Sequence, residues 1–405
     1  MNTPNLKKDI KSTESKGKLN LYAFFYMLLI AVTILSPDEH GTTLKYAIIP
    51  LAGVVLFALL QKRSIKLMIP LRFFILVFAA LMFFSTRASL IVEMGANFRS
   101  TLIMVGSLFI VCGLAPSQEQ MSKIKLFYVI CTVFCGLMVL FEILRAGFSG
   151  IDRQNFNFIW GLKDVNYLLA FMLPGCYFAS RNLVIEKNGH KLLNVLCVFL
   201  VIISILALQT RAAFVTVIIF SGLLFIEYNV KTQLSKKKLA MFVLIIIAVA
   251  LAIIFLINSP QFERLTNFDE YEDNIRLTLW KHAFQAFRNH PVFGSGLGSG
   301  SLYSIIAKGL ETHNNFVDII CDFGMVGISV FAFMILCLLS VKKGCRLHMI
   351  SYITACLVPL AFINGFQTIV FWLPLIMLAH ECTILSEKKE KKEKGKSKIK
   401  RQEII

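Results

Sequence analysis

Residues 313–339 read HNNFVDIICDFGMVGISVFAFMILCLL, so a histidine and two asparagines stand directly before a long apolar run. The run from Phe316 to Leu339 is long enough to cross a bilayer, because a membrane helix needs about 20 mostly apolar residues. His313 therefore lies at the mouth of a predicted membrane helix, where lipid meets water. Two interpretations are open: His313 helps to cap the helix, or it carries out proton chemistry at this boundary.

The rest of the chain has the composition of an integral membrane protein. Of its 405 residues, 57% are hydrophobic and 16% are charged, and the mean hydropathy is +0.70. Soluble domains contain about 45–50% apolar and about 25% charged residues, so this balance predicts an all-α integral membrane protein. The cysteines lie mostly inside apolar runs, which favours packing roles over a disulfide framework or a zinc site.

About twelve apolar segments are candidates for membrane helices. They are Leu19–Ser36, Leu44–Leu60, Ile69–Phe84, Thr101–Leu114, Leu126–Leu144, Val165–Ala179, Leu192–Leu208, Ala212–Ile226, Leu239–Ile257, Phe316–Leu339, Met349–Ile363 and Gln367–Leu378. The first segment follows a polar stretch and lacks a small-residue cleavage site, so we expect a retained membrane helix and not a signal peptide.

Basic residues in the connections set the predicted orientation, because cytoplasmic loops carry an excess of lysine and arginine. They gather in every second connection: Lys62, Arg63 and Lys66; Lys123 and Lys125; Arg181, Lys187 and Lys191; Lys231 and Lys236 to Lys238; and Lys342, Lys343 and Arg346. Both termini are then cytoplasmic, in a bacterial inner membrane. The predicted organisation is a basic cytoplasmic tail over 1–18, membrane helices 1 to 9 over 19–257, a large periplasmic loop domain over 258–312, membrane helices 10 to 12 over 313–380, and a basic cytoplasmic tail over 381–405.

The net charge of +18 comes largely from the two lysine-rich ends of the chain. Neither end has the interleaved aromatic residues of a nucleic-acid-binding segment, so no nucleic acid partner is predicted. Basic tails beside membrane helices instead predict contact with anionic membrane lipids.

Arginines on the predicted outer face oppose the charge bias and need a reason. Arg211 opens the eighth segment, and Arg276 opens a helix in the large loop. A guanidinium group matches the geometry of phosphate oxygens, so an anionic ligand at the outer leaflet is one reason. The alternative is that single arginines snorkel, or that they pair with Asp152, Asp164 or the acidic cluster 269–273.

The large loop contains one helical pattern. From Asn274, interpreted as an N-cap, Leu277, Trp280, Phe284 and Phe287 recur at helical spacing until Pro291. The other face carries Arg276, Lys281, Gln285 and Arg288, so we expect the helix to cover the membrane surface or the bundle with its basic side towards a cavity. The glycines from Gly294 to Gly300 lack the context of a dinucleotide fingerprint and predict a flexible turn that folds over a site.

A histidine flanked by arginines from separate segments suits attack on a phosphate-linked centre. The base accepts a hydroxyl proton while the arginines hold a diphosphate leaving group. Asp318 and Asp322 lie within the apolar run, where an acid is either functional or paired with a neighbouring cation. Gly324 and Gly327, further along, predict close helix packing.

The motifs that these residues form resemble those of the O-antigen ligase and polymerase superfamily. The resemblance rests on Arg276 with Trp280, Pro291, Gly294-x-Gly296-x-Gly298, and His313-Asn314-x9-Gly324-x-x-Gly327. Arg211 fits the family's other arginine, and Lys163-Asp164-Val165-Asn166 is similar to a weaker family motif. The resemblance implies a GT-C-like glycosyltransferase that moves O-polysaccharide from undecaprenyl diphosphate to a sugar hydroxyl of lipid A-core. The reaction would belong to lipopolysaccharide biosynthesis, at the periplasmic face, with no cofactor, nucleotide sugar or metal.

The resemblance also implies roles for single residues. His313 is the catalytic base or positions the acceptor, and Arg211 and Arg276 bind the diphosphate. The supporting candidates are Asn314, which would orient the histidine, and Arg288, Lys163, Asp164, Asn166 and Asp322. The acidic residues Asp269, Glu270, Glu272 and Asp273 offer oxygen ligands for magnesium, but we interpret them as a solvated loop and predict no metal site.

Two other functions remain as alternatives. An O-antigen polymerase would use the same donor and the same residues, and the ligase is preferred for the chain length, the single large outer loop and the basic C-terminal tail. A polysaccharide-lipid flippase would need a continuous charged cavity and no catalytic histidine. No internal repeat is visible, which favours an enzyme over a carrier.

Overall fold

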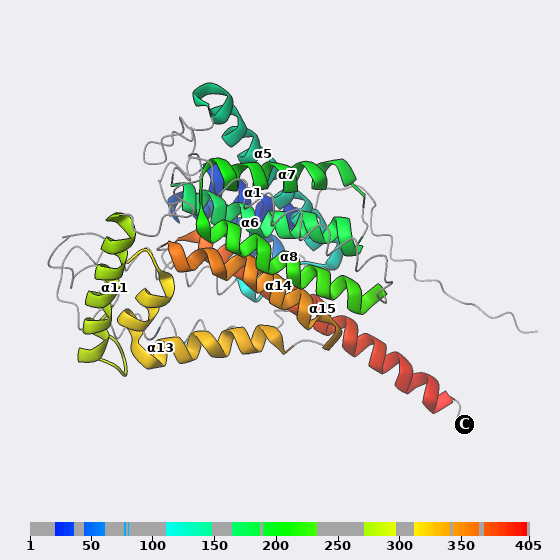
Figure 1. Cartoon of the computed structure of the whole chain (residues 1–405). Coiled ribbons are helices and arrows are strands. Elements are labelled where there is room, and N and C mark those ends of the chain that lie inside the picture. The colour runs from blue at the N-terminus through cyan, green and yellow to red at the C-terminus, as the bar shows by residue number, and fades with distance from the viewer. Residues whose placement is uncertain are drawn as a thin grey trace, which may run out of the picture.

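The computed structural model is a bundle of helices (Figure 1). It describes residues 21–35, 44–60, 77, 80, 111–147, 164–186, 189–232, 271–296, 312–340, 343–363 and 368–402. Within these ranges every regular element is a helix and no strand occurs, in agreement with the predicted all-α class. Lys163, residues 1–18 and the predicted segment Leu239–Ile257 lie outside these ranges, as do most of Ile69–Phe84 and Thr101–Leu114. The total of twelve membrane helices stays a prediction.

Most of the described helices follow the predicted apolar segments, and α11 lies in the predicted large loop. The described helices are α1 (Leu21–Leu35), α2 (Leu44–Leu60), α5 (Gln118–Ala146), α6 (Val165–Arg181), the short π-helix η1 (Asn182–Glu186), α7 (Lys191–Ala207), α8 (Arg211–Thr232), α11 (Tyr271–Asn289), α13 (Asn315–Leu339), the short 3-10 helix η3 (Lys343–Cys345), α14 (Arg346–Leu357), the 3-10 helix η4 (Val358–Phe362) and α15 (Ile369–Gln402).

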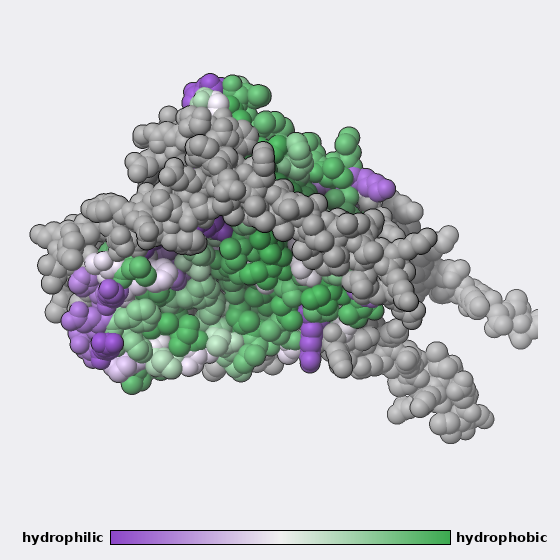
Figure 2. Space-filling view, viewed as in Figure 1, coloured by the Kyte–Doolittle hydropathy of each residue, from purple (hydrophilic) through white to green (hydrophobic). Residues whose placement is uncertain are grey.

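Four of the described helical stretches are long and apolar enough to cross a membrane: Gln118–Ala146, Val165–Glu186, Arg211–Lys231 and Asn315–Leu339. The outward surface of three of them agrees with this, because large apolar side chains are exposed along it, including Leu137, Phe141, Ile218, Ile226, Phe333 and Leu336. Figure 2 shows apolar side chains across the middle of the visible face, with hydrophilic ones gathered over the end where α11 lies. Apolar surface of this extent is typical of contact with lipid.

Helix α6 lies at the centre of the bundle and contacts α5, α7, α8, α14 and α15. All of its residues are buried except Asn166 and Ser180. A small residue sets the approach of α5, because a Cβ atom added to Gly175 would lie 1.9 Å from the Thr132 hydroxyl oxygen. Residues on α6 are therefore held in place from several sides.

Helices α5 and α11 begin before their predicted starts for local reasons. Helix α5 starts at Gln118, before the apolar run, because Ser117 and Gln120 form a reciprocal capping box. Helix α11 starts at Tyr271, so the prediction of Asn274 as the N-cap was wrong. Asn274 lies in the first turn of the helix. Acidic residues are favourable in the first turn of a helix, and Glu272 and Asp273 occupy it here.

The contacts of α6 define the two ends of the bundle. Arg181, the last residue of α6, donates to Glu227 in the last turns of α8, so these helices run in the same direction. Their first residues, Val165 and Arg211, therefore lie at the opposite end. Lys125 and Lys231, which the charge bias assigns to the same side of the membrane as Arg181, also lie near it.

Helix α13 runs towards the Arg181 end of the bundle. It stops at Leu339, a few residues before α14, where His348 hydrogen-bonds to Tyr177 of α6 near Arg181. The start of α13 therefore lies at the other end, together with the first residues of α6 and α8. Figure 1 shows α11 beside the start of α13 and the last turns of α15 extending away from the opposite end. We call the two ends the His313 end and the Arg181 end.

Candidate functional site

The backbone before α13 has an unusual conformation at His313. Asn314 is the N-cap, and its Oδ1 accepts hydrogen bonds from the backbone N–H groups of Phe316 (3.0 Å) and Val317 (3.2 Å). The helix cap is therefore Asn314 and not His313, which removes the simpler interpretation of the histidine. His313 is half-buried and has a φ of 52°, in the left-handed region that residues other than glycine rarely adopt.

Thr312 holds the residues on both sides of His313. It is 1% exposed, its hydroxyl donates to Asp318 Oδ1, and it accepts from the Asn314 N–H at 3.3 Å. The Trp280 indole of α11 donates to the Thr312 carbonyl at 2.9 Å. A left-handed backbone costs about 1–2 kcal/mol, and these bonds offset it. His313 therefore projects from a fixed bend between α11 and α13.

Helix α11 packs on the first turns of α13 through a small residue. Ala283 is fully buried against Val317 and Cys321, and the Cys321 thiol donates to the Ala283 carbonyl at 3.0 Å. Trp280 and Phe287 pack around this contact. The alanine lets the two helix backbones approach closely, which fixes α11 relative to the His313 bend.

The predicted apolar face of α11 was partly wrong. Leu277 and Phe284 are 52% and 41% exposed, whereas the buried positions are Leu279, Ala283 and Ala286. In a membrane environment, small residues favour contact with neighbouring helices while large apolar ones can face lipid. The buried face is therefore rotated from the one that the large side chains indicate.

This rotation separates Arg276 from Lys281 and Arg288, which were predicted to share a face with it. Arg276 is half-buried and lies seven residues, or two helical turns, before Ala283, so it is on the side that faces α13. Lys281 and Arg288 are exposed on the other side. Arg276 can therefore act beside the His313 bend, and Arg288 points away from it.

A break in α13 receives the turn that follows α11. Gly324 has φ 64° and ψ −158°, a non-helical conformation inside the helix. Four backbone hydrogen bonds join the turn 291–296 to the two halves of α13: Ser295 N to Cys321 O (2.8 Å), Gly296 N to Asp322 O (3.1 Å), Met325 N to Pro291 O (2.9 Å) and Val326 N to Val292 O (3.1 Å). The turn thus satisfies backbone groups that the break would otherwise leave unpaired in the membrane.

The prediction that Gly324 serves helix–helix packing was therefore wrong. A Cβ atom at Gly324 would lie 2.6 Å from Gly294 N, and one at Gly294 would lie 2.3 Å from the Asp322 carbonyl carbon. The two glycines let two backbones touch. The predicted close-approach turn is present at Gly294, and Gly298 and Gly300 lie outside the described residues.

The remaining predicted residues occupy several places. Asp164 caps α6 by accepting from the N–H groups of Asn166 (2.7 Å) and Tyr167 (3.3 Å). Arg211 is the first residue of α8 and half-buried, directly after a tight turn with a positive φ at Gln209. Asp322 is buried at the break in α13. The His313 end therefore holds His313, Arg211 and Asp164, together with Arg276 on α11.

Thr312 is the site residue that sequence reasoning missed. A threonine two residues before a capping asparagine, followed by an acid at Asp318, was the available signal. Among the described residues, no three His, Cys, Asp or Glu side chains are placed to hold a metal ion. The side chains of the acidic segment 269–273 lie outside the described part of the chain.

Comparisons with known proteins place this region in one family. Residues 196–332 match a family model described as O-antigen ligase, and the matched segment contains Arg211, Arg276 and His313. A comparison with curated proteins found no match. The family consists of glycosyltransferase-like enzymes of lipopolysaccharide and polysaccharide biosynthesis. The match covers about a third of the chain, and the described helical bundle with four helices able to cross a membrane agrees with this similarity to the O-antigen ligase and polymerase superfamily.

Proposed function

We propose that the chain is an O-antigen ligase with a GT-C-like arrangement of membrane helices. It transfers O-polysaccharide from undecaprenyl diphosphate to a sugar hydroxyl of lipid A-core, at the periplasmic face of the inner membrane. The observation that carries this proposal is the left-handed bend at His313, held by Thr312 and by Trp280 of α11. Arg276 lies on the same face of α11 as Trp280, one turn away.

The transfer needs one base and a stabilised leaving group. The imidazole of His313 takes the proton of the acceptor hydroxyl, and the hydroxyl oxygen attacks the anomeric carbon of the donor sugar. The bond from that carbon to the diphosphate oxygen breaks, and undecaprenyl diphosphate leaves. Arg211 and Arg276 neutralise the diphosphate charge as it develops. The products are glycosylated lipid A-core and undecaprenyl diphosphate, with no metal, nucleotide sugar or other cofactor.

Among the supporting residues, Asn314 and Asp164 act by fixing the first turns of their helices. Asn314 holds the first turn of α13, so its capping bonds orient His313 indirectly. Asp164 fixes the start of α6 in the same way, which leaves Asn166 as a candidate for donor contacts at the His313 end, while Lys163 stays a candidate from the sequence alone. Asp322 sits at the α13 break, and Arg288 is the weakest candidate because it points away from the bend.

The test is transfer in vitro by the purified full-length protein. Undecaprenyl-diphosphate-linked glycan and lipid A-core are supplied with and without a chelator. We expect equal rates in both, and we expect His313→Ala to lower the rate by about 100-fold or more, since general base catalysis contributes roughly 10²–10⁴. His290→Ala is the matched control because His290 is an exposed histidine of the same outer region. Normal transfer by His313→Ala would rule out this mechanism.

The polymerase alternative uses the same residues and differs in its acceptor. A deletion strain separates the two functions. Loss of a ligase leaves polymerised chains on the lipid carrier, whereas loss of a polymerase leaves lipid A-core with a single repeat unit. A flippase would move the glycan lipid across the membrane without forming a new glycosidic bond, so no product would appear in the in vitro assay.

A further inference from the structure

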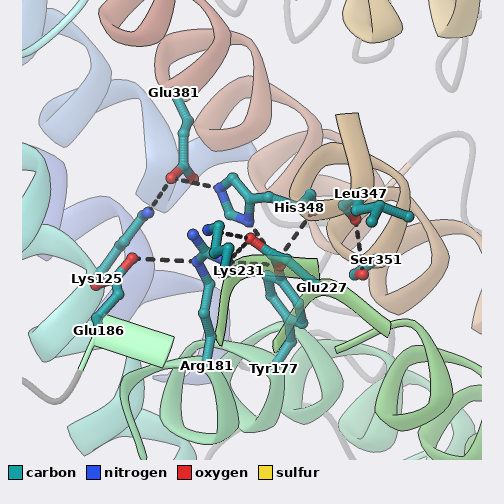
Figure 3. Close-up of polar contacts among 10 residues, drawn as sticks. All are labelled: Lys125, Tyr177, Arg181, Glu186, Glu227, Lys231, Leu347, His348, Ser351 and Glu381. Carbon is teal, nitrogen blue, oxygen red and sulfur yellow. Dashed lines mark hydrogen bonds and ion pairs between the residues drawn. The ribbon is translucent and has the colours of Figure 1, made fainter. Parts of the chain in front are cut away.

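A polar cavity lies at the Arg181 end, away from the His313 bend. Its volume is about 730 Å³, and it lies between the first turns of α5 and α7, the last turns of α6 and α8, the start of α14, and α15. Figure 3 shows the charged side chains that converge beside it from α5, α6, η1, α8, α14 and α15. The proposed transfer reaction uses none of these residues.

Most charges in the wall of this cavity neutralise one another. Arg181 Nη1 donates to both carboxylate oxygens of Glu227 at 2.8 Å, and its Nε donates to Glu186 at 3.1 Å. Lys231 also bonds Glu227, at 2.7 Å. Glu227 is 1% exposed, and both Nε and Nη1 of Arg181 are bonded to carboxylates, so losing one partner would leave an uncompensated buried charge. The cavity is therefore not a simple anion site.

Two acceptors in the wall have no partner. Glu381 uses only its Oε1, which accepts from Lys125 and lies 2.7 Å from His348 Nε2, while its Oε2 is buried without a hydrogen bond. Asn194 Oδ1 is likewise buried without a partner. Both residues line the cavity, and they are 8% and 1% exposed. A buried acceptor without a donor is costly, so the cavity calls for a ligand group with several hydrogen-bond donors.

The rest of the lining suits a lipid. Lys123 and His190 are exposed residues of the same cavity, and Lys123 holds only a surface ion pair with Glu119, which is weak. Met121, Leu126, Ile384 and Leu385 add an apolar wall. The buried acceptors suit an ammonium group, the exposed basic residues suit a phosphate, and the apolar wall suits acyl chains. One lipid molecule carries all three groups.

We infer that this cavity binds the head group of a phosphatidylethanolamine-type lipid. The primary ammonium donates to Glu381 Oε2 and Asn194 Oδ1, and the phosphate lies by Lys123 and His190. A choline head group cannot make the first contact because its nitrogen has no proton, and a glycerol head group lacks the positive charge. The lipid would bridge helices α5, α7 and α15 at this end, independently of the transfer reaction.

The experiment is native mass spectrometry of the delipidated full-length protein. Phosphatidylethanolamine, phosphatidylcholine and phosphatidylglycerol with identical acyl chains are supplied at equal concentration. We expect the ethanolamine lipid to bind about tenfold more tightly than the other two, as loss of one charged hydrogen bond implies. Asn194→Leu should remove this preference. Asn229→Leu is the matched control, because Asn229 Oδ1 is also buried without a partner but does not line the cavity.

The variants and competitors make each outcome decisive. Glu381→Gln should also weaken binding, but it disturbs the contacts of Lys125 and His348, so Asn194→Leu decides the matter if that variant does not fold. Equal binding of the three lipids, or no retained lipid, would leave only adventitious lipid or water in the cavity and overturn the inference. So would unchanged binding by Asn194→Leu. Displacement of the lipid by spermidine or ethanolamine at micromolar concentration would instead assign the cavity to a soluble amine.

Discussion

The Gly324→Ala substitution tests whether the turn after α11 holds the break in α13. The added Cβ would lie 2.5 Å from Val292 O and 2.6 Å from Gly294 N, and both of these atoms belong to the backbone. Neither can move away without breaking the hydrogen bonds of the turn 291–296. The conformation at Gly324, φ 64° and ψ −158°, is also one that alanine adopts only under strain.

The expected magnitude follows from these two effects. Overpacking against backbone atoms costs about 1–3 kcal/mol, and a strained φ/ψ pair costs about 1–3 kcal/mol. Together they destabilise the closed turn by about 2–6 kcal/mol. Since about 1.4 kcal/mol corresponds to a factor of ten, the open turn should be at least about 30 times more populated in the variant.

Amide hydrogen exchange in detergent micelles measures this opening. The informative N–H groups are those that cross between the turn and α13, on Ser295, Gly296, Met325 and Val326. We expect these amides to exchange at least about 30-fold faster in Gly324→Ala, while amides in α8 keep their rates. Transfer activity should fall in parallel, because α11 is tied to α13 partly through this turn.

Gly222→Ala is the matched control for this variant. Gly222 lies within α8, and a Cβ atom there would meet nothing within 4 Å. Alanine in place of an open helical glycine should leave exchange unchanged or slow it slightly. Unchanged protection of Ser295 and Met325 in Gly324→Ala would refute the argument that the turn occupies the break.

Three further predictions concern the His313 bend, the arginines and the buried ion pairs. Thr312→Val keeps the shape of the side chain but removes its bonds to Asp318 and Asn314, so kcat/KM for transfer should fall about tenfold or more, while Thr312→Ser stays near the parent rate. Arg276→Ala should raise the donor KM more than Arg276→Lys, which keeps the charge without the planar fork, and Arg288→Ala should change little because Arg288 points away from α13. Glu227→Gln leaves Arg181 with a weakened buried partner and should cost up to about 3–5 kcal/mol in thermal unfolding, whereas Glu119→Gln, at a side chain 65% exposed, should cost less than about 1 kcal/mol.

The apolar helices that the structure describes were predictable from the sequence because bilayer thickness dictates the length of an apolar run. Helix α2 begins and ends at the predicted residues, and α1 and α7 differ by one or two residues. Helix α5 extends further because a capping box satisfies its first N–H groups ahead of the apolar run. Such a cap is visible in the sequence as Ser117 and Gln120, but apolar patterning does not include it.

The buried face of α11, which packs on α13, was not predictable from the large apolar side chains of the helix. In water, large apolar residues mark the buried side of a helix, and that rule selected Leu277 and Phe284. Beside a membrane, the same residues can face lipid. The contact between α11 and α13 is then made by small residues such as Ala283. The position of Arg276 relative to His313 depends on this choice, so it became clear only from the packing.

The break in α13 is the feature of the site that is hardest to predict from the pattern of side chains. The run from Phe316 to Leu339 is apolar on both sides of Gly324, and a continuous helix fits it. The bonds that stabilise the break come from backbone groups of a turn distant in the sequence, and backbone groups leave no residue signature except the glycines that allow the approach.

The contacts that join α11 to α13 also bear on the proposed reaction. Trp280 bonds the Thr312 carbonyl, Ala283 packs on Cys321, and the turn at Gly294 enters the α13 break, so α11 and the first half of α13 form one unit. Arg276 and His313 both belong to that unit, whereas Arg211 belongs to the bundle through α8. A diphosphate held by both arginines would therefore join the unit to the bundle. Donor binding would then set the distance between His313 and the reacting carbon, so α11 packing bears on catalysis as well as on stability.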